Sequence, residues 1–138
     1  MQQGADMKWL TGHRLQSFIH REYDWVLTFD GEANLVVTCL WRLIEAGRIR
    51  FTSQDDGYRF GLPAPVDAAA EVTRRLAGAL VEAVELREGT LDLDIRFCTG
   101  HVLQVIPDSS GYEAWILSGH NSQIIAVGGG DLAIFGEG

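Results

Sequence analysis

The stretch that most constrains the fold of this chain is its last third, residues 112–135, with the sequence YEAWILSGHNSQIIAVGGGDLAIF. It contains three short apolar runs separated by turn-forming residues, and the second turn holds three consecutive glycines, Gly128 to Gly130. Apolar runs of this length, bounded by turn residues, are typical of buried strands. The pattern therefore predicts strand, turn, strand, glycine turn and strand.

Two roles are open to the glycine cluster. Glycines adopt positive φ without strain and let another backbone approach closely, which favours a tight turn. Their backbone N–H groups could also cradle an anion, as in a phosphate loop. The Lys-Ser/Thr pair of such a loop does not follow, and residues 132–135 predict a strand instead of a helix. The context favours the tight turn.

The end of the chain also matches a two-part motif. Tyr112-Glu113-Ala114-Trp115, Leu117 and Gly119 match the first part, YEAW-x-L-x-G. Residues 129–135 match the second part, PGGELAIW, with Asp for Glu and Phe for Trp, and Gly128 stands at the place of the proline. On these residues the chain resembles a bacterial family of small domains of unknown function.

Leu-x-Gly segments at residues 10–12 and 76–78 also fit this family, so the resemblance extends over most of the chain. The resemblance implies no established activity. Members of the family look like the small partners encoded beside secreted bacterial toxins. The resemblance thus implies an immunity protein that neutralises a toxin.

Charge and length limit the kinds of partner. A chain of 138 residues predicts a single domain, residues 1–138, with a real core. The net charge is −8, and residues 67–138 carry −7 of it. Phosphate binding needs basic residues, so a nucleic acid partner is not expected, whereas a basic toxin domain would be attracted. With no apolar run near the ~20 residues of a membrane span and no signal core in residues 1–10, we expect a cytoplasmic protein and no membrane partner.

Cysteines and histidines give no pattern for a metal or a cofactor. Cys39 and Cys98 lie in apolar, strand-like runs, which predicts buried free thiols and leaves a disulfide open. Neither belongs to a C-x-x-C pair. The four histidines lack metal-ligand spacing. We expect no metal and no cofactor.

Residues 10–37 and 76–105 look like two copies of one unit. Each begins with Leu-x-Gly and continues with runs of alternating apolar residues that turn at Asp30-Gly31 and Thr99-Gly100. A period of two is a strand signal, and paired runs across such turns predict hairpins. The pattern predicts two related antiparallel β-meanders from an internal duplication. Chance similarity between amphipathic hairpins is the alternative.

A hairpin and a helix are expected between the copies. Residues 40–52 predict strand, turn at Ala46-Gly47, and strand. Asp67 is expected to cap a helix from Ala68 to about Ala77, with Val72 and Leu76 on its inner face. The predicted fold class is α+β and mostly β: two related antiparallel β-meanders with one helix between them.

Carboxylates in loops and on strand faces are the expected binding residues. Asp92 and Asp94 alternate with apolar residues and so face one side of a strand, and Asp55 and Asp56 lie in a loop at 54–57. Such groups suit an acidic face for a basic partner. The predicted partner-binding residues are Asp55, Asp56, Asp92, Asp94, Glu113 and Trp115.

Aromatic residues divide by context. Trp25 and Trp115 lie in strand patterns typical of a core, whereas Trp9 near the terminus and Tyr58 in a loop are expected to be exposed.

The predicted function is a non-enzymatic protein that binds and neutralises a partner. One alternative is a small hydrolase-like enzyme that uses His101 or His120 with Asp92 or Asp94. Another is a small-ligand binding β module. A deep pocket with convergent polar groups would favour the alternatives, and a flat acidic face with exposed aromatics would favour partner binding.

Overall fold

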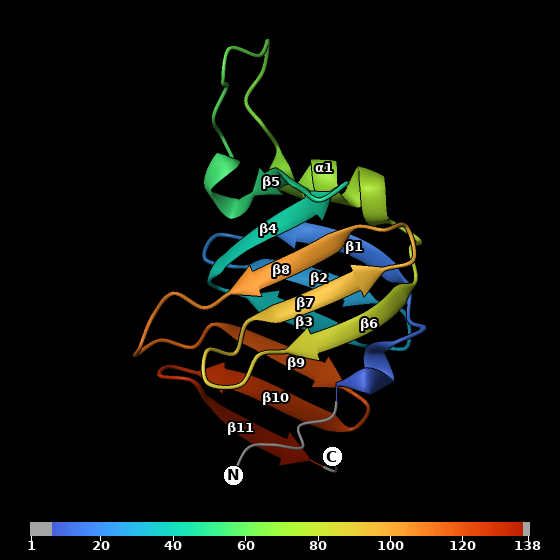
Figure 1. The fold of residues 1–138 in the computed structure, drawn as a ribbon, viewed down its shortest axis with the longest axis vertical. Coiled ribbons are helices and arrows are strands. Elements are labelled where there is room, and N and C mark those ends of the chain that lie inside the picture. The colour runs from blue at the N-terminus through green and yellow to red at the C-terminus, as the bar shows by residue number, and fades with distance from the viewer. Residues whose placement is uncertain (1–6, 137–138) are drawn as a thin grey trace.

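The computed structural model describes residues 7–136 as two antiparallel sheets that pack face to face, with one helix over an edge (Figure 1). The fold is α+β and mostly β, as predicted. The six-stranded sheet has the order β1 (Leu15–His20), β2 (Trp25–Phe29), β3 (Asn34–Val37), β9 (Trp115–Gly119), β10 (Ser122–Val127) and β11 (Asp131–Gly136). The five-stranded sheet has the order β5 (Arg48–Thr52), β4 (Leu40–Glu45), β8 (Val102–Ile106), β7 (Leu93–Phe97) and β6 (Val81–Leu86).

Three helical segments complete the described chain. Two are 3₁₀ turns, η1 (Lys8–Leu10) and η2 (Ser53–Asp55). The helix α1 (Ala68–Leu76) begins where Asp67 accepts a hydrogen bond from the Ala70 N–H at 3.1 Å, as predicted. Val72 and Leu76 are fully buried on its inner face. The helix packs against β1 and β5 and so covers the edge where the two sheets open.

The two meanders have the same order and direction. Strands β1-β2-β3 and β6-β7-β8 each form an antiparallel meander, and each has a register shift at the start of its first strand. Their beginnings contact each other reciprocally. The Gly12 N–H donates to Val81 O at 2.8 Å, and the Gly78 N–H donates to Leu15 O at 2.7 Å. Arg14 and Leu80 form a bridge between these two contacts.

After each meander the chain crosses to the opposite sheet. Strand β4 comes after β3 but pairs with β8, and β9 comes after β8 but pairs with β3. Trp41 begins the buried side of β4 opposite Val105, and Trp115 begins that of β9 opposite Val37. Both tryptophans are almost completely buried. The inward side chains of the two sheets therefore form one core.

The predicted turns are present. Chain reversals occur at Asp30-Gly31, Ala46-Gly47 and Thr99-Gly100, and β11 begins directly after the glycine cluster. Gly129 and Gly130 have φ of +83° and +90°, which confirms the tight turn. A Cβ on Gly130 would overlap the carbonyl oxygen of Gly89, so this turn also packs closely on a second loop.

Two predictions about exposure are wrong. Cys98 is exposed, because it lies in the turn after β7 and not within the strand. Trp9 is half-buried, because its ring stacks on His120 with ring centroids 5.6 Å apart. Cys39 is buried as predicted, and its burial raises the pKa of the thiol to about 12.

Candidate functional site

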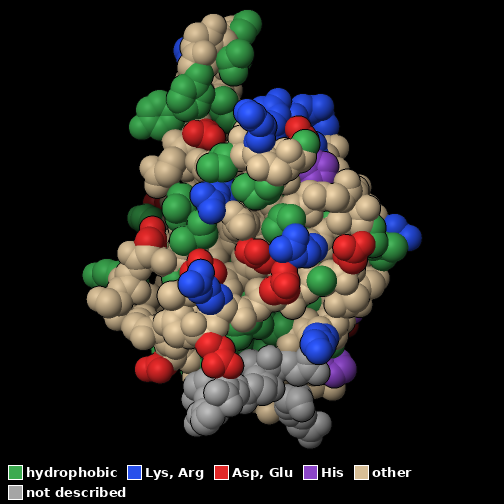
Figure 2. Space-filling view, viewed as in Figure 1, with side chains coloured by type: hydrophobic (Ala, Val, Ile, Leu, Met, Phe, Trp, Pro, Cys, Tyr) green, Lys and Arg blue, Asp and Glu red, His purple; other side chains and the backbone are tan. Residues whose placement is uncertain are grey.

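An arm formed by residues 57–66 projects from one end of the molecule, between η2 and α1 (Figure 1). It carries three large apolar side chains that are mostly exposed: Tyr58 at 60%, Phe60 at 65% and Leu62 at 53%. The space-filling view shows hydrophobic side chains along this projection (Figure 2). Since an apolar cluster of this kind is uncommon on a protein surface, the arm is a candidate contact site.

Backbone and side-chain hydrogen bonds give the arm its shape. At its base the Gly57 N–H donates to Val66 O, and the Val66 N–H donates to Tyr58 O, both at 2.8 Å. Near the tip the Arg59 guanidinium donates to Pro63 O at 2.8 Å. Gly61 has a φ of +76°, where the chain reverses. The arm is thus preorganised by its own contacts.

Asp55 and Asp56 hold the base of the arm. One Asp55 oxygen accepts from the Thr52 N–H at 2.9 Å, and one Asp56 oxygen accepts from the Ala68 N–H at 2.9 Å. The other Asp56 oxygen lies 3.2 Å from His20 Nδ1. Both aspartates are only partly exposed. Their hydrogen bonds hold the N-terminal ends of η2 and α1 in place. The sequence pattern predicted only a loop here and did not identify this role.

A recess of about 610 Å³ lies between β1 and the base of the arm. His20 lines it and stacks on Trp25 with ring centroids 3.7 Å apart. The residues that line this recess include an imidazole and two aspartates but no serine, threonine or cysteine. They provide no hydroxyl or thiol nucleophile for the His20–Asp56 pair.

Asp94 lies on β7 and Asp92 comes directly before this strand, so the two do not share one strand face as predicted, but both lie among arginines. They line a groove on the five-stranded sheet with Arg42, Arg87 and Arg96. Arg96 Nη2 is 3.8 Å from an Asp94 oxygen. Acidic and basic side chains are interspersed over this face of the molecule (Figure 2). This face is therefore of mixed charge, and the carboxylates of Asp92 and Asp94 do not stand alone on it.

Arginine also neutralises the neighbouring carboxylate. Arg96 Nε donates to Glu85 at 2.7 Å, and this hydrogen bond is the main reason why the pKa of Arg96 is raised. Nearby, Arg42 Nε donates to Gln104 Oε1 at 2.5 Å. Two carboxylates of the groove, those of Glu85 and Asp94, are therefore paired with Arg96.

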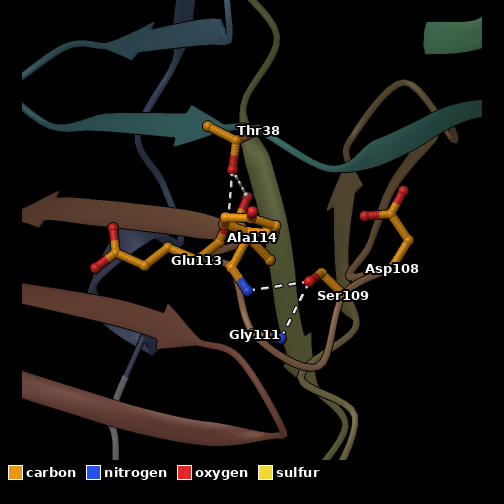
Figure 3. Close-up of a pocket in the computed structure, with 7 residues that line it drawn as sticks. Thr38, Asp108, Ser109, Gly111, Glu113 and Ala114 are labelled. Carbon is orange, nitrogen blue, oxygen red and sulfur yellow. Dashed lines mark hydrogen bonds between the residues drawn. The ribbon is translucent and has the colours of Figure 1, made fainter.

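Glu113 is exposed beside a hollow of about 590 Å³ (Figure 3). Thr38 donates its hydroxyl to the Glu113 carbonyl at 2.7 Å. Ser109 Oγ accepts from the Gly111 and Tyr112 N–H groups at 3.1 and 3.0 Å. The residues that line this hollow include no histidine. Both hydroxyl oxygens form hydrogen bonds with backbone groups and so shape the loop.

Trp115 belongs to the core. Its side chain is 1% exposed, and its Nε1–H donates to Leu91 O at 2.9 Å. The prediction that this residue is a core tryptophan is confirmed, whereas its assignment to the binding surface is wrong. Trp115 is the first residue of β9 and faces inward, while Glu113 lies in the loop before the strand and faces solvent.

The histidines of the predicted enzyme site do not meet Asp92 or Asp94. His101 Nε2 lies 2.9 Å from Glu45 Oε1, and His101 Nδ1 lies 2.8 Å from Thr99 Oγ1. His101 lies at the opposite end of β7 from the two aspartates, and the ring of His120 stacks on Trp9. The His101 cluster ties the β7–β8 turn to β4 and, through Arg75, to α1.

Glu45 is the centre of that cluster. Its carboxylate lies 3.1 Å from Arg75 Nε and 3.4 Å from Arg50 Nε. The hydrogen bond with His101, and after it that with Arg75, holds the pKa of Glu45 below its usual value. A carboxylate shared by three cationic or hydrogen-bonding partners stabilises the junction of sheet and helix.

Metal binding and membrane insertion each require a particular grouping of side chains. No group of three or more His, Cys, Asp or Glu side chains in residues 7–136 is arranged to hold a metal ion. Within the same residues, no helix has the length and hydropathy required to cross a membrane.

The prolines of the arm indicated only the end of a strand. The exposed apolar cluster of the arm was therefore not predicted from the sequence. A signal is present all the same: Tyr58, Phe60 and Leu62 alternate with Arg59 and Gly61, directly before two prolines. Large apolar residues in a segment that proline keeps out of a sheet have no core to enter, so they are exposed.

Comparison with known protein families shows which family the chain matches. The model of a protein family described as "Family of unknown function (DUF6188)" matches residues 6–136. No curated protein and no solved structure matches the chain.

Proposed function

We propose that this chain, which belongs to the family of unknown function DUF6188, binds a partner protein through the arm and neutralises it, as an immunity protein neutralises a toxin. The observation that carries the proposal is the exposure of Tyr58, Phe60 and Leu62 on one projecting segment. Support for the toxin as partner comes from the motif at the chain's end.

The energetics favour the arm as an anchor. Burying one large apolar side chain contributes about 1.5–3 kcal/mol, and aromatic anchors at the centre of an interface dominate affinity. Because the arm is closed by its own hydrogen bonds, less conformational entropy is lost on binding. A projecting, preorganised segment of this kind suits insertion into a cleft of the partner.

Charge favours a basic toxin domain. Residues 45–76, which include the arm and α1, contain five arginines and five acidic residues. The net charge of −8 therefore belongs to the rest of the chain. The net negative charge of the rest of the chain would attract a basic partner, and the arm, within its electrically balanced segment, would make the apolar contact.

The first prediction concerns the arm. Phe60→Ala and Tyr58→Ala should each weaken binding to the cognate toxin, to be sought in the neighbouring reading frame, by about 10–100-fold, because each removes an apolar anchor. The loss should appear mainly in the dissociation rate, and protection of cells that express the toxin should fall. Surface plasmon resonance and a co-expression growth assay measure the two effects.

Tyr23→Ala is the matched control, since Tyr23 is 84% exposed and lies in the turn between β1 and β2. It should change binding by less than about twofold, because exposed positions outside an interface are nearly neutral. Urea unfolding should show that all three variants keep the parent's stability. Full binding by both arm variants would contradict the proposal.

A further inference from the structure

The outward face of the six-stranded sheet carries a continuous aliphatic row. Inward side chains of this sheet, such as Leu27, Leu35 and Leu117, are buried, so their neighbours along each strand point outward. The strand register places six outward aliphatic residues side by side across all six strands. The row consists of Ile19, Val26, Val36, Ile116, Ile125 and Ala133.

The neighbouring outward row is uncharged as well. The same register gives Ser17, Thr28, Asn34, Ser118, Gln123 and Phe135. Phe135 at the outer edge is 57% exposed, and Ile19 at the other edge is 52% exposed. Helix α1 packs against β1 and β5, the two strands at the edge of the sheets. Together the two rows, which we call the neutral face, contain no charged side chain.

The fold does not require aliphatic residues there. The matching row on the five-stranded sheet, at equivalent positions of the second meander and the opposite hairpin, is polar and charged. Its members are Glu85, Asp94, Gln104, Arg42 and Thr52. An outward row in this architecture is thus compatible with charges, and the neutral face has a composition that suits contact with protein.

We propose that the neutral face is the contact between two copies of this chain. A net charge of −8 on each copy makes two copies repel wherever their charged surfaces meet. The neutral face is a surface on which they can pack without placing like charges together. Under two-fold symmetry the same rows meet each other, so uncharged residues of one copy would contact uncharged residues of the other.

The test is the oligomeric state of the full chain. Sedimentation velocity from micromolar to several hundred micromolar protein should show a monomer–dimer equilibrium. Val36→Glu should weaken dimerisation by about tenfold or more, because it buries an unpaired charge near the middle of the contact. Gln104→Glu is the matched control at the equivalent position of the other sheet, and it should leave the dimer unchanged.

Salt gives an independent readout. Screening of the repulsion between two copies of like charge should strengthen the dimer as ionic strength rises. Binding of a basic partner should weaken under the same change, so the two contacts are distinguishable. Phe60→Ala on the arm should leave dimerisation unaffected.

Each outcome decides the proposal. A monomer at every concentration and salt level overturns it, as does a dimer that Val36→Glu leaves intact. If circular dichroism shows that Val36→Glu does not fold, Val36→Gln replaces it, since glutamine occupies the equivalent position in the other sheet. A folded Val36→Gln variant that dimerises as well as the parent also overturns the proposal.

Discussion

Strands β1–β5 and strands β6–β10 trace the same path, and they differ in the side chains that they present to solvent and in the segments that come after them. Val26 and Val36 stand on the outward face of the first meander where Asp94 and Gln104 stand on that of the second. After β5 the chain forms the arm and α1, whereas after β10 it adds β11. The two units thus share their inward-facing tryptophans. They differ in their outward-facing side chains and in the segments that follow them.

The comparison separates residues that determine the fold from residues that are free to carry function. Trp41 and Trp115 occupy matching places at the two crossings and are both buried. Similar packing on the inside explains the similar pairing of strands. Outward positions are under no such restriction, so one sheet bears paired charges and the other a neutral face. Origin of the two units by duplication stays a prediction.

The largest effect on stability is expected at Gly130, in the turn between β10 and β11. This turn packs closely on the loop that contains Gly89. Gly130→Ala should destabilise the protein by about 3 kcal/mol or more, because positive φ strain adds to an overlap with the Gly89 carbonyl. Gly47→Ala in the β4–β5 turn should cost only about 1 kcal/mol, since its Cβ enters open space. Urea unfolding compares the stabilities of the two variants. Equal losses of stability would show that the neighbouring loop moves to accommodate the added methyl group at Gly130.

A smaller difference is expected between the two crossing tryptophans. Trp115→Phe removes the hydrogen bond to Leu91 O and leaves a buried carbonyl unpaired. Trp41→Phe removes a buried Nε1–H that has no hydrogen-bond partner among the described residues. Beyond the loss of volume common to both, Trp115→Phe should therefore cost about 1–2 kcal/mol more. Chemical denaturation measures the difference, and a larger loss at Trp41 would contradict the assignment.

The smallest effect is expected for Glu45, whose ion cluster has no counterpart at Gly119, the matching position of β9. Since the folded-state pKa of Glu45 is lowered, its ionised form contributes stability above the unfolded pKa of about 4.3, and the contribution disappears as pH falls through the lower folded value. Glu45→Gln should reduce the urea midpoint slightly near neutral pH and not at strongly acidic pH. An equal reduction at both would mean that the ionised carboxylate is not the cause.

Much of the local structure could be predicted from the sequence. Period-two runs indicated the strands of both meanders, Asp67 and the spacing of Val72 and Leu76 indicated the helix, and the glycine cluster indicated a tight turn. These signals are local, since they depend on backbone propensity and on neighbours a few residues apart.

Less of the candidate site could be predicted from the sequence. Asp92 and Asp94 were predicted to face one side of a strand, but the arginines that line their groove include one from a strand distant in the sequence, Arg42. Asp55 and Asp56 lie in a segment with the composition of a solvated loop. Both carboxylates nevertheless accept hydrogen bonds from backbone N–H groups. Whether a carboxylate is free depends on partners that a local pattern does not identify.

By itself the sequence determined the strands, the helix, the sharp turns and the acidic balance, because periodicity, capping and charge are properties of neighbouring residues. Only the tertiary structure decided that β4 and β9 exchange sheets, that Trp115 lies inside while the arm lies outside, and that six aliphatic residues from six strands form one row. Strand partners are chosen by packing between distant segments, and a surface exists only after that choice is made.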